Sequence, residues 1–207
     1  RDTGLVSQVF DEEKLRGLTG NMSVGHVRYS TTGSSGWENT QPIYRADHHM
    51  IALAHNGNLI NAVELHAELR DQNINFRSTS DSEIIAALVS NSPAASLQEA
   101  VAEVMPKLKG AFSTVIVNKE AVVGFRDPAG LRPLALGQIG ERYCLASESS
   151  AFDIIGAKFL REVEPGELIA LTEGGIETQL VLPGQRKAFC VFEHIYFARP
   201  DTHLEGE

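Results

Sequence analysis

Residues 113–125 read Ser-Thr-Val-Ile-Val-Asn-Lys-Glu-Ala-Val-Val-Gly-Phe, and this stretch decides the fold class. Two runs rich in β-branched residues, 113–117 and 121–125, flank the turn-forming triplet Asn118-Lys119-Glu120. Apolar segments on either side of a turn of this length are typical of a β-hairpin. The stretch therefore predicts two neighbouring antiparallel strands.

Segments of the same kind lie on both sides of this hairpin. Each is short, rich in β-branched or aromatic residues and bounded by turn-forming residues. The predicted strands are 24–29, 50–54, 134–136, 143–146 and 167–171.

Three helices are predicted between the early strands and the hairpin. The first covers residues 62–71, and the second begins at Ser80, where Ser80 and Glu83 match a capping box. The third covers residues 96–108, with Gly110 as its stop signal. Its predicted buried residues are Leu97, Val101, Val104 and Met105.

Strands, then adjacent helices, then more strands do not follow the regular alternation of a doubly wound parallel sheet. An α+β fold with antiparallel sheets and helices layered on them is therefore predicted. No internal repeat and no long linker divides the 207 residues, which favours one domain.

The composition excludes several classes of protein. The formal charge is −9, from 27 acidic and 18 basic residues without a Lys/Arg cluster, so no nucleic-acid partner is expected. The apolar runs are too short to cross a membrane, and no membrane partner is expected. The spacing of Cys144 and Cys190 matches neither a disulfide framework nor a zinc site, and a reducing cytoplasm is the expected location.

Three polar segments carry candidate chemistry, and each also has an ordinary structural explanation. Arg28 precedes a hydroxyl- and Gly-rich loop, where it could bind a carboxylate bidentately or form an edge-strand ion pair. Asn56-Gly57 predicts a tight turn, although an exposed amide and N–H also suit an oxyanion hole. Asp81 lies at a helix start, where it could stabilise the helix dipole or bind an ammonium group.

Together and in this order, the segments GHVRYS (25–30), HNG (55–57) and SDSE (80–83) resemble the class II glutamine amidotransferases, whose nucleophile is an N-terminal cysteine. Further segments, among them DPAGLRPL (127–134) and YFARPD (196–201), are similar to the amidophosphoribosyltransferases within that class. Tyr29 supports this narrower family, because glucosamine-forming relatives carry Trp at that point. The resemblance covers nearly the whole chain.

The resemblance implies a four-layer αββα sandwich of antiparallel sheets, incomplete at its N-terminus. Residues 1–207 would then be a partial glutamine amidotransferase type 2 domain. It also implies site roles by position. Arg28, with Thr31 nearby, would bind the α-carboxylate of glutamine, Asp81 would bind its α-ammonium group, and Tyr29 would line the pocket. Asn56 and Gly57 would form the oxyanion hole through the side-chain amide and the backbone N–H.

The resemblance further implies a full-length parent that is a glycosyltransferase of purine biosynthesis. That parent would make 5-phosphoribosylamine from glutamine and phosphoribosylpyrophosphate, with a phosphoribosyltransferase domain and Mg²⁺ that are expected to be absent here. No cofactor is expected in this chain. Some family members hold a 4Fe–4S cluster, with one ligand near the position of Cys190, and a structural thiol is the alternative for this residue. The parent is expected to be a homo-oligomer.

The chain begins at Arg1 without the family's N-terminal cysteine, so by itself it is expected to be inactive. Neither Cys144 nor Cys190 has an α-amine of its own to carry protons, and Cys144 is expected to be an ordinary buried thiol. Two alternatives stay open. One is a non-catalytic truncated homologue that binds glutamine or a partner chain. The other is the glutaminase domain of another class II amidotransferase, such as the glucosamine-6-phosphate-forming enzyme.

Overall fold

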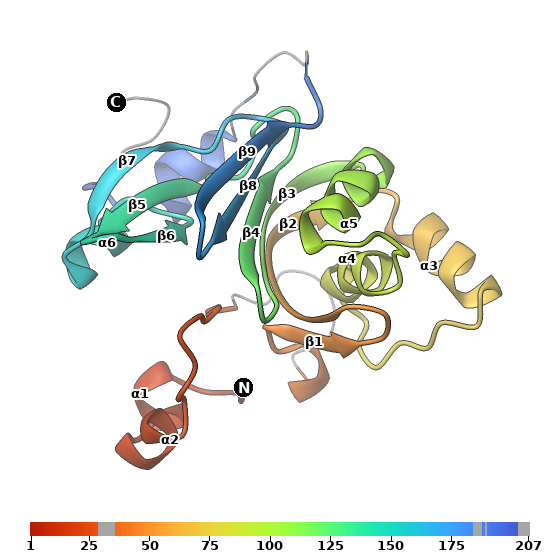
Figure 1. Ribbon diagram of the computed structural model, residues 1–207, viewed down its shortest axis with the longest axis horizontal. Coiled ribbons are helices and arrows are strands. Elements are labelled where there is room, and N and C mark those ends of the chain that lie inside the picture. The colour runs from red at the N-terminus through yellow and green to blue at the C-terminus, as the bar shows by residue number, and fades with distance from the viewer. Residues whose placement is uncertain (29–35, 184–187, 189, 203–207) are drawn as a thin grey trace.

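Two antiparallel sheets lie face to face in the computed structural model, which describes residues 1–28, 36–183, 188 and 190–202 (Figure 1). The larger sheet has the strand order β1-β2-β3-β4-β8-β9, and the smaller sheet has the order β6-β5-β7. Their bounds are β1 (Ile43–Ala46), β2 (Met50–Leu59), β3 (Gly110–Val117), β4 (Ala121–Arg126), β5 (Ala135–Ile139), β6 (Arg142–Ala146), β7 (Lys158–Glu162), β8 (Glu167–Thr172) and β9 (Gly175–Leu180).

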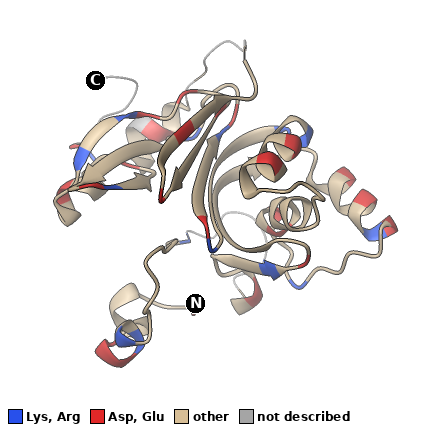
Figure 2. Ribbon diagram, in the orientation of Figure 1, with Lys and Arg blue, Asp and Glu red and all other residues tan. Residues whose placement is uncertain are grey.

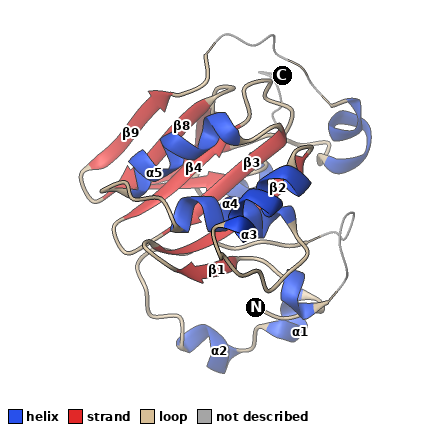
Figure 3. Ribbon diagram, turned by 90° about the vertical axis from the view of Figure 1, so that its right-hand side faces the viewer, coloured by secondary structure: helices blue, strands red, loops and turns tan. Residues whose placement is uncertain are grey.

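Three helices form a layer on the outer face of the larger sheet, in which the second and third contact the sheet and the first packs against the second (Figure 3). They are α3 (Ala62–Asp71), α4 (Asp81–Ser90) and α5 (Leu97–Val104). Because successive strand residues point to opposite faces, Ile116 and Val123 pack under these helices while their neighbours Val115 and Val122 face the smaller sheet.

A fourth layer covers the outer face of the smaller sheet. There α6 (Ser150–Ile155) buries Phe152 against Ala135 and Ala157. Three separate apolar clusters thus fill the three interfaces between helices, larger sheet, smaller sheet and α6. The predicted αββα sandwich is confirmed.

Short helices connect or flank these layers. The helices α1 (Val6–Val9) and α2 (Glu12–Arg16) lie outside the sandwich, η1 (Trp37–Asn39) precedes β1, and η3 (Glu193–Phe197) is a π-helix near the C-terminus (Figure 1). Across the described ranges, every helix is too short or too polar to traverse a lipid bilayer.

Several predicted elements differ from the structure. The hairpin of β3 and β4 is confirmed, with Val117 opposite Val122. The predicted strand 24–29 is wrong over its described residues, since 24–28 have no regular structure, and Tyr29 lies outside the described part. The third helix ends at Val104 and continues as the 3-10 turn η2 (Met105–Lys107), because Pro106 lacks the N–H that an α-helix needs. Gly110 begins β3 rather than stopping the helix.

Candidate active site

A cavity of about 660 Å³ gathers residues from every polar segment named above. Arg28, Asn56, Gly57 and Asp81 all line it, although they come from three separate parts of the chain. Tyr29 and Thr31, the other two predicted substrate-binding residues, lie outside the described residues.

Asn56 and Gly57 lie inside β2, so the predicted tight turn at this dipeptide is wrong. They pair with Ser113 and Phe112 of β3. Gly57 has φ +149°, and a Cβ there would collide with the carbonyl oxygen of Ala111. The glycine therefore allows a close approach of two strands rather than a chain reversal.

On the edge of β2 beside the cavity, side chains form hydrogen bonds with the backbone of His55 and with the N–H of Leu59, and Gly57 lies between these two residues. The Gln41 side chain accepts from the His55 N–H at 2.7 Å and donates to its carbonyl at 3.2 Å, in place of a strand partner. Gly57 lies two residues further along, so its N–H is expected on this same edge. On the other edge of β2, Phe112 of β3 lies opposite Gly57 but bonds Asp127. Its N–H donates to the Asp127 carboxylate, and its carbonyl accepts from the Asp127 N–H.

Asp81 is the first residue of α4, and its carboxylate is anchored on one side only. Its Oδ2 accepts a hydrogen bond from the Leu59 N–H at 2.9 Å. Its Oδ1 lies 3.8 Å from Nδ1 of His55, which is itself 3.2 Å from the Ser82 hydroxyl oxygen. Burial lowers the pKa of His55, so a neutral imidazole leaves the negative charge of Asp81 uncompensated by this neighbour.

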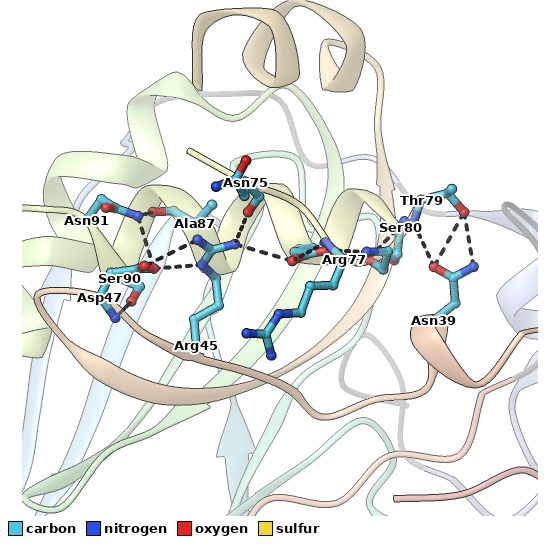
Figure 4. A network of polar contacts seen from close by, with 12 residues as sticks. Asn39, Arg45, Asp47, Asn75, Arg77, Thr79, Ser80, Ala87, Ser90 and Asn91 are labelled. Carbon is cyan, nitrogen blue, oxygen red and sulfur yellow. Dashed lines mark hydrogen bonds and ion pairs between the residues drawn. The ribbon is translucent and has the colours of Figure 1, made fainter. Parts of the chain in front are cut away.

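A polar network fixes the start of α4, and one of its members, Ser80, lines the cavity (Figure 4). The Ser80 hydroxyl caps the helix by accepting from the Ser82 N–H. Glu83 does not complete the predicted capping box with Ser80. Its carboxylate instead accepts from the backbone N–H groups of Arg77 and Ser78, at 2.6–3.1 Å, and from Arg45 at 3.3 Å. The loop before α4 is thereby tied to its first turn.

His26 lines the cavity beside Arg28, and the fold changes its titration strongly. Burial, followed by the nearby His55 and Arg28, lowers the pKa of His26 from 6.5 to about 4. At neutral pH this side of the cavity therefore carries an uncharged imidazole beside a guanidinium.

Arg132 is a site residue that the sequence patterns did not single out. Its Nη2 donates to the Oδ1 of Asn56 at 2.8 Å. Since a guanidinium only donates, the Asn56 amide must present its oxygen to Arg132 and its NH₂ elsewhere. The signal that could have identified Arg132 was a charged residue in a loop otherwise rich in Gly and Pro.

The two cysteines lie near different parts of the site. Cys190 lines the main cavity, whereas Cys144 lines an adjoining cavity of about 420 Å³. Cys144 is half-buried rather than fully buried, and desolvation raises the pKa of its thiol. A raised pKa favours the protonated thiol, which is a poor nucleophile.

Basic residues elsewhere in the molecule are spread among the N-terminal helices, the helical layer and the sheets (Figure 2).

A family model described as a glutamine amidotransferase domain matches residues 26–153. The amidophosphoribosyltransferase of Mycobacterium leprae (strain TN) is 43% identical over 214 residues, covering 100% of this chain and 38% of that protein. The amidophosphoribosyltransferase of Bacillus subtilis (strain 168) is 40% identical over 205 residues, covering 98% of this chain and 43% of that protein. The chain thus spans about two fifths of the length of these relatives.

Solved structures agree with the sequence relatives. One described as the allosteric regulatory enzyme of purine biosynthesis superposes with a TM-score of 0.92 at 39% identity, covering 98% of this chain and 44% of that chain. The glutamine phosphoribosylpyrophosphate amidotransferase from B. subtilis, complexed with ADP and GMP, superposes with a TM-score of 0.81 at 39% identity, covering 87% and 39%. The predicted resemblance is confirmed, and because the family model matches more than half of the 207 residues, the chain belongs to the family of glutamine amidotransferase domains.

Proposed function

We propose that this chain is the glutaminase domain of an amidophosphoribosyltransferase, with free glutamine as its ligand. One observation carries the proposal: a single cavity is lined by a guanidinium, a carboxylate, a side-chain amide and a glycine of a strand edge. Glutamine has the complementary groups, namely an α-carboxylate, an α-ammonium group and an amide carbonyl. The family membership supports the same ligand.

In this proposal Arg28 binds the α-carboxylate and Asp81 the α-ammonium group. The two charges select a free amino acid over a glutamine within a peptide chain, whose backbone nitrogen and carbonyl are neutral. Tyr29 and Thr31 stay predicted members of this pocket. The amide NH₂ of Asn56 and the N–H of Gly57 donate to the amide oxygen of glutamine as it becomes negative in the tetrahedral intermediate.

The chemistry would follow the thiol mechanism of the family. A cysteine thiolate adds to the amide carbon, and collapse of the intermediate breaks the C–N bond, protonates the nitrogen and releases ammonia. The resulting glutamyl thioester is hydrolysed by water to glutamate, which regenerates the thiol. Because neither Cys144 nor Cys190 carries its own α-amine, we propose that residues 1–207 alone do not turn over glutamine.

The activity of the whole protein belongs to the same proposal. It would use the released ammonia and phosphoribosylpyrophosphate to make 5-phosphoribosylamine in purine biosynthesis, in the cytoplasm and as a homo-oligomer. Residues 1–207 would be part of its glutamine domain. Mg²⁺ would act in a separate phosphoribosyltransferase domain, and Cys190 remains a proposed cluster ligand for those parents that hold a 4Fe–4S cluster.

The test is glutamine hydrolysis by the whole protein that carries this chain, with Arg28→Met and Asp81→Asn as variants. Each should raise KM for glutamine about 100-fold, because each removes a charge-assisted contact to the substrate. Arg142→Met, an exposed arginine on the smaller sheet, is the control for loss of a cation. A KM that stays at the wild-type value in both variants would show that the cavity does not bind glutamine in this way.

A further inference from the structure

We propose that Arg132 is a positioning residue for the oxyanion hole, and that its ion pair with Glu193 couples this role to the C-terminal helix η3. The inference rests on the proposed function, since it assigns a role to the Asn56 amide in glutamine hydrolysis. It adds residues from two further segments, 127–133 and 193–197, to the catalytic cavity.

The first step is the orientation of Asn56. A side-chain amide can rotate by half a turn, and only one orientation directs its NH₂ toward a developing oxyanion. Arg132 donates from Nη2 to Oδ1 of Asn56 at 2.8 Å. The reversed amide would put NH₂ against a group that has no acceptor, so Arg132 selects a single orientation.

The second step is the rigidity of the loop that carries Arg132. The carboxylate of Asp127, which is fully buried, accepts from the N–H groups of Ala129 and Leu131 at 3.0–3.2 Å. From the other side, buried Arg126 donates to the carbonyl oxygens of Gly130 and Arg132, at 2.8 and 2.7 Å. The backbone of Arg132 is therefore fixed before its side chain reaches Asn56.

The third step is the ion pair that holds the guanidinium itself. Arg132 Nη1 lies 2.8 Å from Oε2 of Glu193, and the two side chains are only 16% and 8% exposed. The guanidinium carbon also lies 5.1 Å from the ring centroid of Phe197. Both partners belong to η3, so one turn of π-helix clamps the group that orients Asn56. If η3 moved away from the cavity, Arg132 would lose its ion pair with Glu193, and the Asn56 side-chain amide would be free to rotate.

The experiment is a double-mutant cycle in the whole protein, with glutamine hydrolysis as one readout. Asn56→Ala should lower kcat about 100-fold with little change in KM. Arg132→Met should lower kcat at least 10-fold with the same KM, because a displaced donor costs transition-state binding only. Adding Arg132→Met to Asn56→Ala should have no further effect on kcat. Equal losses in both backgrounds would mean that Arg132 acts independently of Asn56, which overturns the inference.

Two further measurements separate this inference from the proposed function and from misfolding. The side-chain amide of Asn56, followed by ¹⁵N relaxation, should be rigid in the wild type and mobile in Arg132→Met and Glu193→Gln, whether or not the protein turns over glutamine. An equally rigid amide in both variants would refute the positioning role. If Arg132→Met does not fold, Arg132→Lys keeps the buried charge opposite Glu193 but cannot reach two partners, and an unchanged kcat there would also refute it. Arg16→Met, which breaks an exposed ion pair with Glu12 in α2, outside the sandwich, is the control and should leave kcat and the Asn56 amide unchanged.

Discussion

At the residue scale, Gly57 matters both for the packing of β2 against β3 and for the shape of the cavity, because both require a residue without a Cβ atom. Gly57→Ala should destabilise the protein by about 3 kcal/mol and lower kcat, because a Cβ cannot avoid the Ala111 carbonyl unless β2 and β3 separate. Chemical denaturation and glutamine hydrolysis measure the two effects. Gly140→Ala is the matched control, since Gly140 also has positive φ, +58°, but open space around its Cβ position. It should cost about 1 kcal/mol and leave kcat unchanged. Equal effects at both positions would contradict the close-approach argument.

His26 makes stability depend on pH in a defined window. The unfolded chain binds a proton at this imidazole below about pH 6.5, whereas the folded protein does so only below about 4. Between these values the unfolded state holds the extra proton, so the free energy of unfolding should fall as the pH is lowered from 6.5 to 4 and level off below that. The contribution is at most about 1.4 kcal/mol per pH unit. His26→Asn should flatten this part of the profile in denaturation experiments, with His48→Asn, an exposed histidine, as control. An unchanged slope in His26→Asn would assign the pH dependence to other groups.

Sequence patterns identified the residues that are proposed to contact a ligand, but not the residues that hold them in position. Arg28, Asn56, Gly57 and Asp81 stand in recognisable segments, and the fold brings all four to one cavity. Arg132 lies 76 positions from Asn56 along the chain, and no spacing rule connects a loop residue with a strand residue at that separation. The conformation of Asn56-Gly57 was mispredicted for a related reason. A glycine that permits close strand contact and one that permits a turn have the same local sequence.

At the scale of elements, the first turn of α4 determines where Asp81 points. Glu83→Ala should destabilise the protein by about 2 kcal/mol and raise KM for glutamine. It leaves the N–H groups of Arg77 and Ser78 without their carboxylate acceptor, and it removes one of the two carboxylates, Glu83 and Asp47, that pair with the Arg45 guanidinium. Ser96→Ala is a matched control at another helix start, where Ser96 and Glu99 form a complete capping box. That variant should cost about 1 kcal/mol without changing KM. If both variants leave KM at the wild-type value, the network of Figure 4 is structural only.

The strands that the sequence did not predict share one property, which is their place in the sheets. β1 and β9 are the two edges of the larger sheet, and β7 is an edge of the smaller one. An edge strand exposes side chains that a central strand buries, and in β9 the last four residues are all exposed. Such a strand lacks the apolar signature that identified β3, β4 and β8. The helices were easier, because α3 and α5 bury apolar residues at helical spacing and α4 is buried along most of its length.

At the scale of the whole molecule, the cavity exists only where the layers and the C-terminal segment meet. Its walls come from residues 25–28, from β2, from the start of α4, from the 131–132 loop and from η3. These segments are brought together by the stacking of the two sheets and by the pairing of β2 with β3. A change that separates the sheets should therefore disturb the site without altering any residue that lines it.

Gly124 lies at the interface between the two sheets, where there is little room for a side chain. A Cβ on this β4 residue would lie 2.5 Å from Cδ1 of Leu145 on β6 and 3.3 Å from Cδ2 of Leu134. Gly124→Ala should therefore destabilise the protein by about 1–3 kcal/mol through overpacking, and Leu145→Ala by about 2 kcal/mol through lost burial. In the double variant the added methyl group occupies part of the space left by the leucine, so the combined loss should be smaller than the sum of the two single losses. Denaturation of the four proteins measures this coupling, and glutamine KM should follow stability across the series because the sheet interface supports the cavity from behind. If the two losses of unfolding free energy were strictly additive, the structure would relax independently at Gly124 and at Leu145. The rigid stacking of the two sheets that we infer would then be wrong.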